Sequence, residues 1–208
     1  AGKSDQYEVV FAIADWVTTN IEYNLSSITA DAVHPSSWVL ENGYGVCDEM
    51  TNLFISLNRA LGIPARFVSG VAYTNLEGLP PWGGHGWAEV YFPDIDKWVP
   101  FDPTYGEYGY VDSGHIKLRA SHDSEGNSIE FSATGYDFRL KTQALKFDVD
   151  ILGTSPRDFE FIAVEFEPYA REVSFGSYNE LTMRVRNLRD YYVSTRVDIS
   201  ETSELEHL

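Results

Sequence analysis

The spacing of apolar positions changes from a helical period to a strand period within the first hundred residues. Apolar side chains recur every three to four positions over 7–21, which predicts an amphipathic helix. A short helix is expected from Ser37 until Gly43 ends it. A longer helix is expected to open at Cys47, with its apolar stripe over 53–61.

The third predicted helix has sequence signals at both ends. Gly62 stands where a left-handed C-terminal cap is expected, and Pro64 prevents the helix from continuing. A glycine-rich turn precedes Cys47, which places this cysteine in the first helical turn. Unpaired amide groups and the positive end of the helix dipole are expected to lower the thiol pKa, whereas Asp48 and Glu49 raise it by their charge.

After residue 65 the pattern is that of β-strands. A glycine- and proline-rich loop is predicted over 75–84, and the polar stretch 106–127 is interpreted as a long loop over the sheet. Strands are predicted over 66–73, 85–92, 98–101 and 129–151.

Beyond Ser155 the chain changes character again. Apolar and polar residues alternate over 181–186 and 193–199, as in half-buried antiparallel strands. This segment is about half as long as the ~100 residues of an immunoglobulin sandwich. We therefore expect two domains. Residues 1–155 form an α+β core, and residues 156–208 form a short all-β module, either small in itself or a truncated immunoglobulin-like sandwich.

Composition and charge exclude several classes of protein. Hydrophobic residues make up 43% of the 208 residues and aromatic residues 14%, which indicates a packed globular protein rather than a disordered one. The net charge of −17 repels phosphate backbones, so no nucleic-acid partner is expected. No apolar run reaches the ~18 residues of a membrane span, so none is predicted in this chain.

The turn near Pro93 determines how His85 and Asp102 are related. In an antiparallel hairpin the numbers of paired residues have a constant sum, and a sum of 187 sets these two residues opposite each other. A turn two residues longer gives 189 and makes them diagonal neighbours. Either odd sum leaves both side chains on the same face, because side chains alternate with period two; a bulge would spoil this parity.

The chain has a single cysteine, so an internal disulfide and a paired-cysteine zinc site are both excluded. Taken alone, Cys47 could be a small core residue, His85 a strand-edge histidine, and Asp102 part of an ordinary Asp-Pro turn. Together the three favour a catalytic triad. Cys47 would attack a carbonyl carbon, His85 would take the thiol proton and later protonate the leaving group, and Asp102 would fix the imidazole tautomer.

Three stretches resemble the signature blocks of the transglutaminase-like superfamily: GYGVCDEMTNLFISLNRALGIPARFVSG, GGHGWAEVY and WVPFDPT. The catalytic Cys, His and Asp of that family come in this order and fall on Cys47, His85 and Asp102. The resemblance, which runs from about Ile21 to Thr104, implies a papain-like α+β fold with the nucleophile helix packed on an antiparallel sheet. Members include cross-linking transglutaminases, peptide N-glycanases, and microbial proteins regarded as proteases or amidases.

The resemblance also suggests an oxyanion donor, because members usually carry an aromatic residue upstream of the cysteine. Tyr23 matches that position, although an ordinary tyrosine at a helix end fits equally well. Trp82 and Trp87 are candidates either for walls of a substrate channel or for plain packing. The zinc-binding cysteines of the N-glycanases and the calcium sites of the animal enzymes have no counterpart. We therefore expect no metal and no cofactor.

The remaining polar residues receive structural interpretations. Acid pairs in a turn and in a strand are not expected to bind metal: Asp94 with Asp96, and Asp148 with Asp150. A further group is interpreted as solvated loop residues, because its spacing fits no standard metal-ligand pattern: His115, His122 and Asp123.

The sequence therefore predicts a thiol-dependent enzyme that acts on the peptide or amide carbonyls of a protein or peptide substrate. Hydrolysis is favoured over amine transfer, because the loop 75–84 suggests no closed tunnel that would exclude water. The alternative is a catalytically retired module with a ligand-binding or surface structural role. The β-module slightly favours a cell-surface or secreted setting by analogy, while the substrate and the oligomeric state stay open.

Overall fold

The structure is a computed structural model. It describes residues 5–27, 33–75, 80–124, 147–153, 161–174, 176–190 and 193. The contacts divide the chain into two compact units, Ala1–Asp150 and Ile151–Leu208. The expected division into domains 1–155 and 156–208 stays a prediction.

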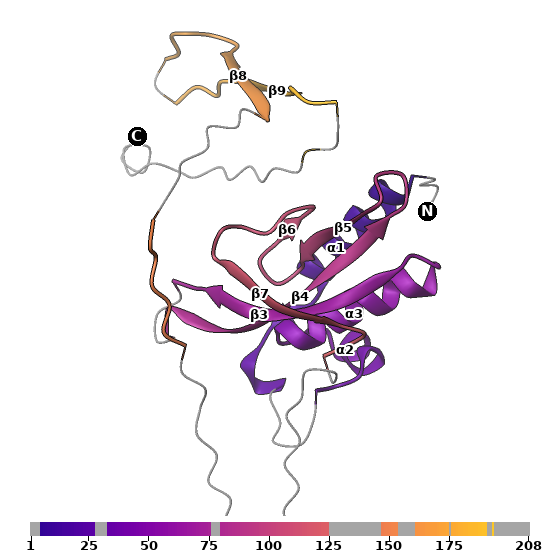
Figure 1. The fold of residues 1–208 in the computed structure, drawn as a ribbon. Helices are drawn as coiled ribbons and strands as arrows, with labels where there is room; N and C mark the ends of the chain where they lie inside the picture. Colours follow the sequence, from indigo (N-terminus) through magenta and orange to yellow (C-terminus); the bar gives the residue numbers. More distant parts are fainter. Residues whose placement is uncertain are drawn as a thin grey trace, which may run out of the picture. The chain divides into compact units, whose positions relative to one another are not determined.

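Three α-helices precede the main sheet in the first unit (Figure 1). They are α1 (Gln6–Asn20), α2 (Ser36–Asn42) and α3 (Cys47–Ala60). Between them lie the short elements β1 (Glu22–Tyr23), η1 (Leu25–Ser27) and β2 (Tyr44–Gly45). Gly62, with φ of 77°, follows α3 in the left-handed conformation. The predicted start of this helix at Cys47 and its glycine stop are confirmed.

The main sheet has the strand order β6-β5-β4-β3-β7, with every neighbouring pair antiparallel. Its strands are β3 (Ala65–Tyr73), β4 (Trp82–Phe92), β5 (Lys97–Asp102), β6 (Glu107–Tyr108) and β7 (His115–Ser121). The strands predicted over 66–73, 85–92 and 98–101 are confirmed. The interpretation of 106–127 as one long loop was wrong, because β6 and β7 lie within it.

The register of the β4–β5 hairpin confirms the predicted parity. Ala88 pairs with Phe101 and Phe92 with Lys97, so paired numbers sum to 189. This is the longer of the two turns considered, and it occupies residues 93–96. Asp102 therefore lies on the same face as His85, at the point where β5 ends.

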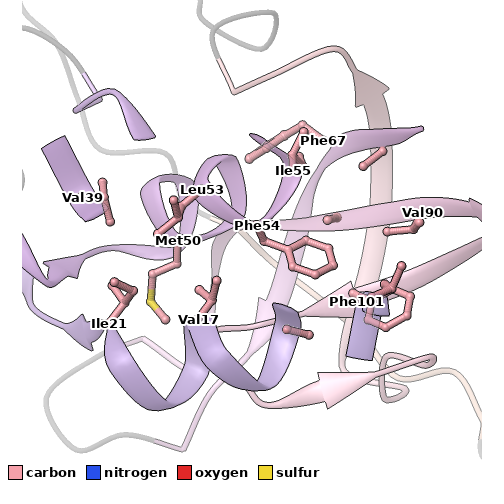
Figure 2. Packing of buried hydrophobic residues seen from close by; sticks show 14 of the residues in the cluster. Val17, Ile21, Val39, Met50, Leu53, Phe54, Ile55, Phe67, Val90 and Phe101 are labelled. Carbon is pink, nitrogen blue, oxygen red and sulfur yellow. The ribbon is translucent and has the colours of Figure 1, made fainter. Parts of the chain in front are cut away.

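The hydrophobic core lies between the helices and one face of the sheet (Figure 2). The helical stripes face inward because their apolar side chains recur at the helical period, while β3, β4 and β5 contribute alternate residues to the same layer. The fully or almost fully buried members include Val10, Val17, Leu53, Phe54, Phe67, Ala88, Val90 and Phe101. This layer makes α3 a rigid base for the residue at its first position.

The second unit contains an antiparallel hairpin of β8 (Ile162–Pro168) and β9 (Leu181–Asn187). The apolar residues of β9 were expected to be half-buried, but they are exposed: Leu181 is 60% and Val185 44% accessible. Residues 147–151 form no strand. Most of the other strands expected, over 129–146 and 194–199, lie outside the described residues. In the part that the structure describes, no helix has the length and apolarity needed to cross a membrane.

Candidate active site

The turn that leads into α3 is held by a buried carboxylate. Glu49 accepts a hydrogen bond from the Val46 N–H at 2.9 Å through Oε2 and another from the His34 N–H at 2.9 Å through Oε1. Its side chain is 1% exposed. Because Val46 directly precedes Cys47, these bonds fix the backbone from which the thiol projects.

A buried hydrogen bond connects the helix of the cysteine to the strand of the histidine. Thr51, one turn into α3, donates from Oγ1 to the carbonyl of Gly86 in β4 at 3.0 Å. Gly86 must lack a side chain here, because a Cβ would lie 2.3 Å from Phe67 and 2.5 Å from Asp48 Oδ1. The glycine after His85 thus allows α3 to approach β4 closely.

His85 and Asp102 form a short, enclosed pair. His85 Nε2 lies 2.6 Å from Asp102 Oδ2, and the two side chains are 7% and 0% exposed. The other carboxylate oxygen, Oδ1, accepts the N–H groups of Thr104 at 2.8 Å and Tyr105 at 3.1 Å. Asp102 therefore holds the ring through one oxygen and the following turn through the other.

The thiol of Cys47 is half-buried and donates to Asp48 Oδ1 at 3.7 Å. Among the hydrogen bonds of the described residues, none joins this sulfur to His85. Burial raises the thiol pKa to about 12, with the charge of Asp48 as the second cause; the Gly86 N–H lowers it by less. The amide group at the helix start lowers this pKa, as expected, but the loss of hydration outweighs it and the net shift is upward.

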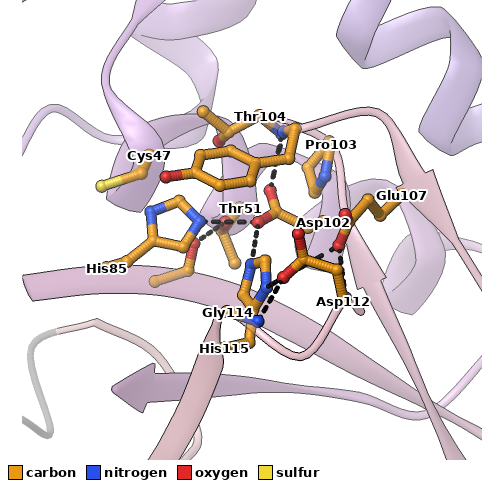
Figure 3. A network of polar contacts seen from close by, with 12 residues as sticks. Cys47, Thr51, His85, Asp102, Pro103, Thr104, Glu107, Asp112, Gly114 and His115 are labelled. Atoms are coloured by element: carbon orange, nitrogen blue, oxygen red, sulfur yellow. Dashed lines mark hydrogen bonds and ion pairs between the residues drawn. The ribbon is translucent and has the colours of Figure 1, made fainter. Parts of the chain in front are cut away.

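The three predicted residues nevertheless lie in one region. Figure 3 shows the Cys47 side chain next to the His85 ring, on the side away from Asp102. The negative charge of Asp102 contributes to the raised pKa of Cys47, and the charge of His85 acts on Asp48, the neighbour of the thiol. With Nε2 bonded to Asp102, the remaining ring nitrogen, Nδ1, is the one available to a thiol.

His115 is a site residue that the sequence interpretation missed. Its side chain is fully buried, not solvated as expected, and its Nε2 lies 3.0 Å from Asp102 Oδ2 while its Nδ1 lies 2.9 Å from Asp112 Oδ1. Burial lowers its pKa, but the hydrogen bonds to Asp102 and Asp112 outweigh burial and raise the pKa to about 9. Conversely, burial raises the Asp102 pKa, and the bonds from His115 and His85 bring it down to about 2.

His115 also brings together the two outer strands of the sheet. Its Nδ1 lies 3.7 Å from Glu107 Oε2, which belongs to β6 at the opposite end of the strand order. Burial raises the Glu107 pKa. The other two residues placed in the same loop, His122 and Asp123, have exposed side chains, as expected.

Tyr23 lies near the thiol because of a short parallel pairing. It pairs with Gly45, two residues before Cys47. Burial raises the Tyr23 pKa to about 12, with the charges of Cys47 and Tyr105 next in size. Its phenol is therefore neutral at physiological pH and able to donate a hydrogen bond.

The two tryptophans differ in their relation to the site. Trp87 is 2% exposed and packs against His85, at 6.2 Å between ring centroids, and against His115, at 5.2 Å. Trp87 is thus a buried ring that packs against both imidazoles. Trp82 packs against the Tyr73 ring, with 5.4 Å between the ring centroids. A role for either tryptophan in a substrate channel stays a prediction.

Two sets of described side chains bring their polar atoms within 4.8 Å of one another, as metal ligands do: His85, Asp102 and His115, and Glu107, Asp112 and His115. In the first set both imidazoles bond Asp102 Oδ2, and in the second Asp112 Oδ1 bonds His115 Nδ1 while Glu107 Oε2 accepts the main-chain N–H of Asp112. In the β4–β5 turn, Asp96 accepts the Tyr91 hydroxyl at 2.6 Å, in keeping with the structural role expected for Asp94 and Asp96. Asp148 and Asp150 lie outside any strand, which corrects their expected place.

The segment that carries Cys47, His85 and Asp102 matches a known protein family. Residues 1–103 match the transglutaminase-like superfamily. The matched half of the chain belongs to this superfamily. Its helices and antiparallel sheet form the α+β, papain-like core that this membership implies, and the matched segment contains Cys47, His85 and Asp102.

Two relatives of this transglutaminase-like chain show how far the similarity extends. The crystal structure of a candidate cysteine protease from Cytophaga hutchinsonii is 29% identical, with a TM-score of 0.51, over 61% of this chain and 40% of that protein. The uncharacterised protein YebA of Bacillus subtilis (strain 168) is 29% identical over 116 residues, which is 49% of this chain and 16% of YebA. The chain thus spans less than half the length of either relative.

Proposed function

We propose that this chain is a thiol-dependent enzyme that transfers acyl groups at peptide or amide carbonyls through a thioester on Cys47. His85 is the base and Asp102 orients it. The observation that carries the proposal is the buried 2.6 Å bond between His85 Nε2 and Asp102 Oδ2. The strand of His85, β4, is in turn hydrogen-bonded to α3, the helix that begins at Cys47. Membership of the superfamily and the similarity to a candidate cysteine protease support it.

The first half of the reaction forms the thioester. Asp102 holds the proton of His85 on Nε2, so Nδ1 takes the proton of the Cys47 thiol as the sulfur attacks the carbonyl carbon. The carbonyl oxygen becomes negative and is stabilised by the Cys47 N–H and the neutral hydroxyl of Tyr23. The tetrahedral intermediate then breaks its C–N bond, and the departing amine takes the proton from His85 Nδ1.

The thiol must first leave its resting partner. Its proton is directed to Asp48, and its pKa of about 12 leaves almost no thiolate at neutral pH. Proton transfer to His85 must therefore accompany the attack rather than precede it. A rotation of the thiol toward the imidazole, as substrate covers the site, supplies this step.

The second half releases the acyl group. Water loses a proton to His85 Nδ1 and attacks the thioester carbon, which yields a carboxylic acid and regenerates the thiol. An amine in place of water would yield a new amide, that is, a cross-link. We favour water, because transfer requires a channel that excludes solvent, and Trp87, one of the two tryptophans considered as walls of such a channel, is buried rather than lining an opening.

A catalytically retired, ligand-binding module is the alternative. The observation that favours it is the bond from the thiol to Asp48 in place of His85, together with the raised thiol pKa. Labelling with iodoacetamide across pH separates the two readings. His85→Ala is compared with the wild type and with His122→Ala, which alters an exposed histidine.

An enzyme should alkylate at least about tenfold more slowly at neutral pH after loss of His85, whereas the His122 variant should match the wild type. Equal rates in all three proteins would refute the pairing and favour the retired module. Incubation with a glutamine-containing protein and a fluorescent primary amine then compares peptide cleavage and ammonia release with amine incorporation. Stoichiometric incorporation with negligible cleavage or deamidation would reverse the preference for hydrolysis.

A further inference from the structure

The hydrogen bonds of His115 require a particular protonation state. A neutral imidazole carries one N–H and can donate to one acceptor only, whereas an imidazolium donates through both nitrogens. Both nitrogens of His115 face carboxylates, Asp102 at 3.0 Å and Asp112 at 2.9 Å, and Glu107 adds a third negative group at 3.7 Å. The contacts alone therefore favour a protonated ring within a fully buried side chain.

The path of β3 explains how a strand two places away from β4 reaches the site. Gly70 of β3 pairs with His85 on one side and with Lys117 of β7 on the other. A Cβ on this glycine would lie 2.6 Å from Trp87 and 2.2 Å from the Ile116 carbonyl oxygen. The missing side chain leaves room for the Trp87 ring, against which the His115 ring packs at 5.2 Å, and Figure 3 shows the rings of His85 and His115 reaching Asp102 from two different directions.

We propose that His115 is a positioning residue: as an imidazolium it holds the Asp102 carboxylate that orients His85, and it sets a lasting positive charge beside the His85 ring. This inference rests on the proposed function, in which His85 is the base. Both rings bond the same oxygen, Oδ2, and their centroids lie 5.6 Å apart. Asp102 cannot turn toward one ring without losing the other.

The charge of His115 has a direct effect on the base. Two unit charges 5.6 Å apart disfavour each other by the equivalent of about one to two pH units at the effective dielectric constants of partly buried sites. The charge of His115 therefore opposes a second proton on the His85 ring, which would leave Nδ1 able to accept the thiol proton. Its own raised pKa of about 9 agrees with a ring that stays charged through this range.

Several other titratable groups face the two rings and also affect their protonation. From the strands and turns around His115 these are Asp102, Asp112, Glu107 and the ring of Tyr105, which lies 5.2 Å from the His115 ring. From α3 the carboxylate of Asp48 and the thiol face His85. The acids around His115 keep it protonated, and Asp102 stands between the two rings as their shared acceptor.

The test measures the pKa of each histidine by nuclear magnetic resonance of the full chain with nitrogen-15-labelled rings. His115→Gln removes the charge but leaves an amide N–H able to donate to Asp102. Asp112→Asn keeps an acceptor for His115 but replaces the carboxylate whose hydrogen bond helps to raise the His115 pKa. His122→Gln, which changes an exposed ring, is the control.

We expect the wild type to contain one ring that titrates near pH 9 and disappears in His115→Gln, while the His85 pKa rises by about one to two units in that variant. In Asp112→Asn the pKa near 9 should move toward 6.5, and the control should change neither value. A His115 ring titrating near 6.5 in the wild type, or a His85 pKa unmoved in His115→Gln, would overturn the proposal. A lower melting temperature without a shift of the His85 pKa would likewise reduce His115 to a structural role.

The ring titrations also separate this proposal from the function on which it rests. Thiol labelling that is indifferent to His85→Ala refutes the proposed function, but the effect of His115 on the His85 pKa can still be measured. Conversely, a reactive thiol combined with an unmoved His85 pKa in His115→Gln refutes the inference and leaves the function intact.

Discussion

The charge of Asp48 should control how readily the thiol ionises. In Asp48→Asn the amide oxygen can still accept the thiol proton, but the negative charge 3.7 Å from the sulfur is gone. Two unit charges at this separation interact by about 4–5 kcal/mol at an effective dielectric constant of 20 and by about 1 kcal/mol in bulk water. Because both side chains are partly exposed, we expect about 1.5–3 kcal/mol, which lowers the thiol pKa by about one to two units.

The expected change in reactivity is smaller than the change in pKa. At pH 8 the thiolate fraction rises about 10- to 100-fold, but a less basic thiolate is a weaker nucleophile with a Brønsted slope of about 0.4–0.5. Alkylation by iodoacetamide should therefore accelerate only about 3- to 10-fold. The rate is measured from pH 6 to 11, so that the same curve gives both the thiol pKa and the limiting rate of the thiolate.

Asp48→Glu is the matched control, since it keeps the charge and changes only its reach. It should keep most of the elevation of the thiol pKa. If Asp48→Asn titrates within about 0.3 units of the wild type, burial alone raises the pKa of Cys47 and our assignment of Asp48 as the second cause is wrong.

Two further predictions concern stability. The pKa of Asp102 is lowered to about 2, so this group contributes stability that is present above its ordinary pKa of 3.8 and is lost as pH falls toward 2. The pKa of His115 is raised to about 9, so this group contributes stability that is present below its ordinary pKa of 6.5 and is lost as pH rises toward 9. Urea unfolding should therefore show a maximum between about pH 4 and 6.5, with up to about 2–3 kcal/mol lost by pH 9, and this alkaline slope should vanish in His115→Gln. A chain ending at Ser155 should still melt cooperatively and keep its thiol reactivity; loss of the cooperative transition would mean that the C-terminal strands complete the core.

The sequence was sufficient for the elements whose signals are local. Gly62 and Pro64 end α3 where predicted, and the apolar stripe of that helix faces the core. The relation of His85 to Asp102 followed from strand parity alone, because any regular hairpin of odd sum leaves them on one face. These arguments need only the backbone geometry between neighbouring elements.

The sequence did not predict the strand that carries His115, because the usual pattern of buried apolar and exposed polar residues is reversed there. Its alternating apolar residues, Ile116 and Leu118, are 37% and 67% exposed, whereas the side chain of His115 is fully buried. A strand is ordinarily recognised by an apolar face turned inward. Here a polar residue, His115, turns inward, because the carboxylates that it meets lie at the end of β5, on β6 and in the loop before β7. Only the tertiary arrangement brings these partners together.

The upward shift of the thiol pKa was not predicted for a related reason. The helix start that should favour a thiolate was identified correctly, and the Asp48 N–H does lower the pKa. How much water the thiol loses, however, depends on how closely α3 approaches β4 at Gly86. The spacing of residues along the sequence does not predict that distance.

The contact between Glu107 and His115 also bears on how the protein behaves among other copies of itself. Within the described part of the chain, β6 and β7 are the two edges of the sheet, and unpaired strand edges invite strand addition by another chain. Here one inward-pointing ionisable side chain from each edge meets the other, His115 of β7 and Glu107 of β6, at 3.7 Å. Inward-pointing charged groups are among the features that make a strand edge a poor template for another chain. We therefore expect the polar cluster around His115 to disfavour strand addition where β6 and β7 meet it, in addition to positioning Asp102.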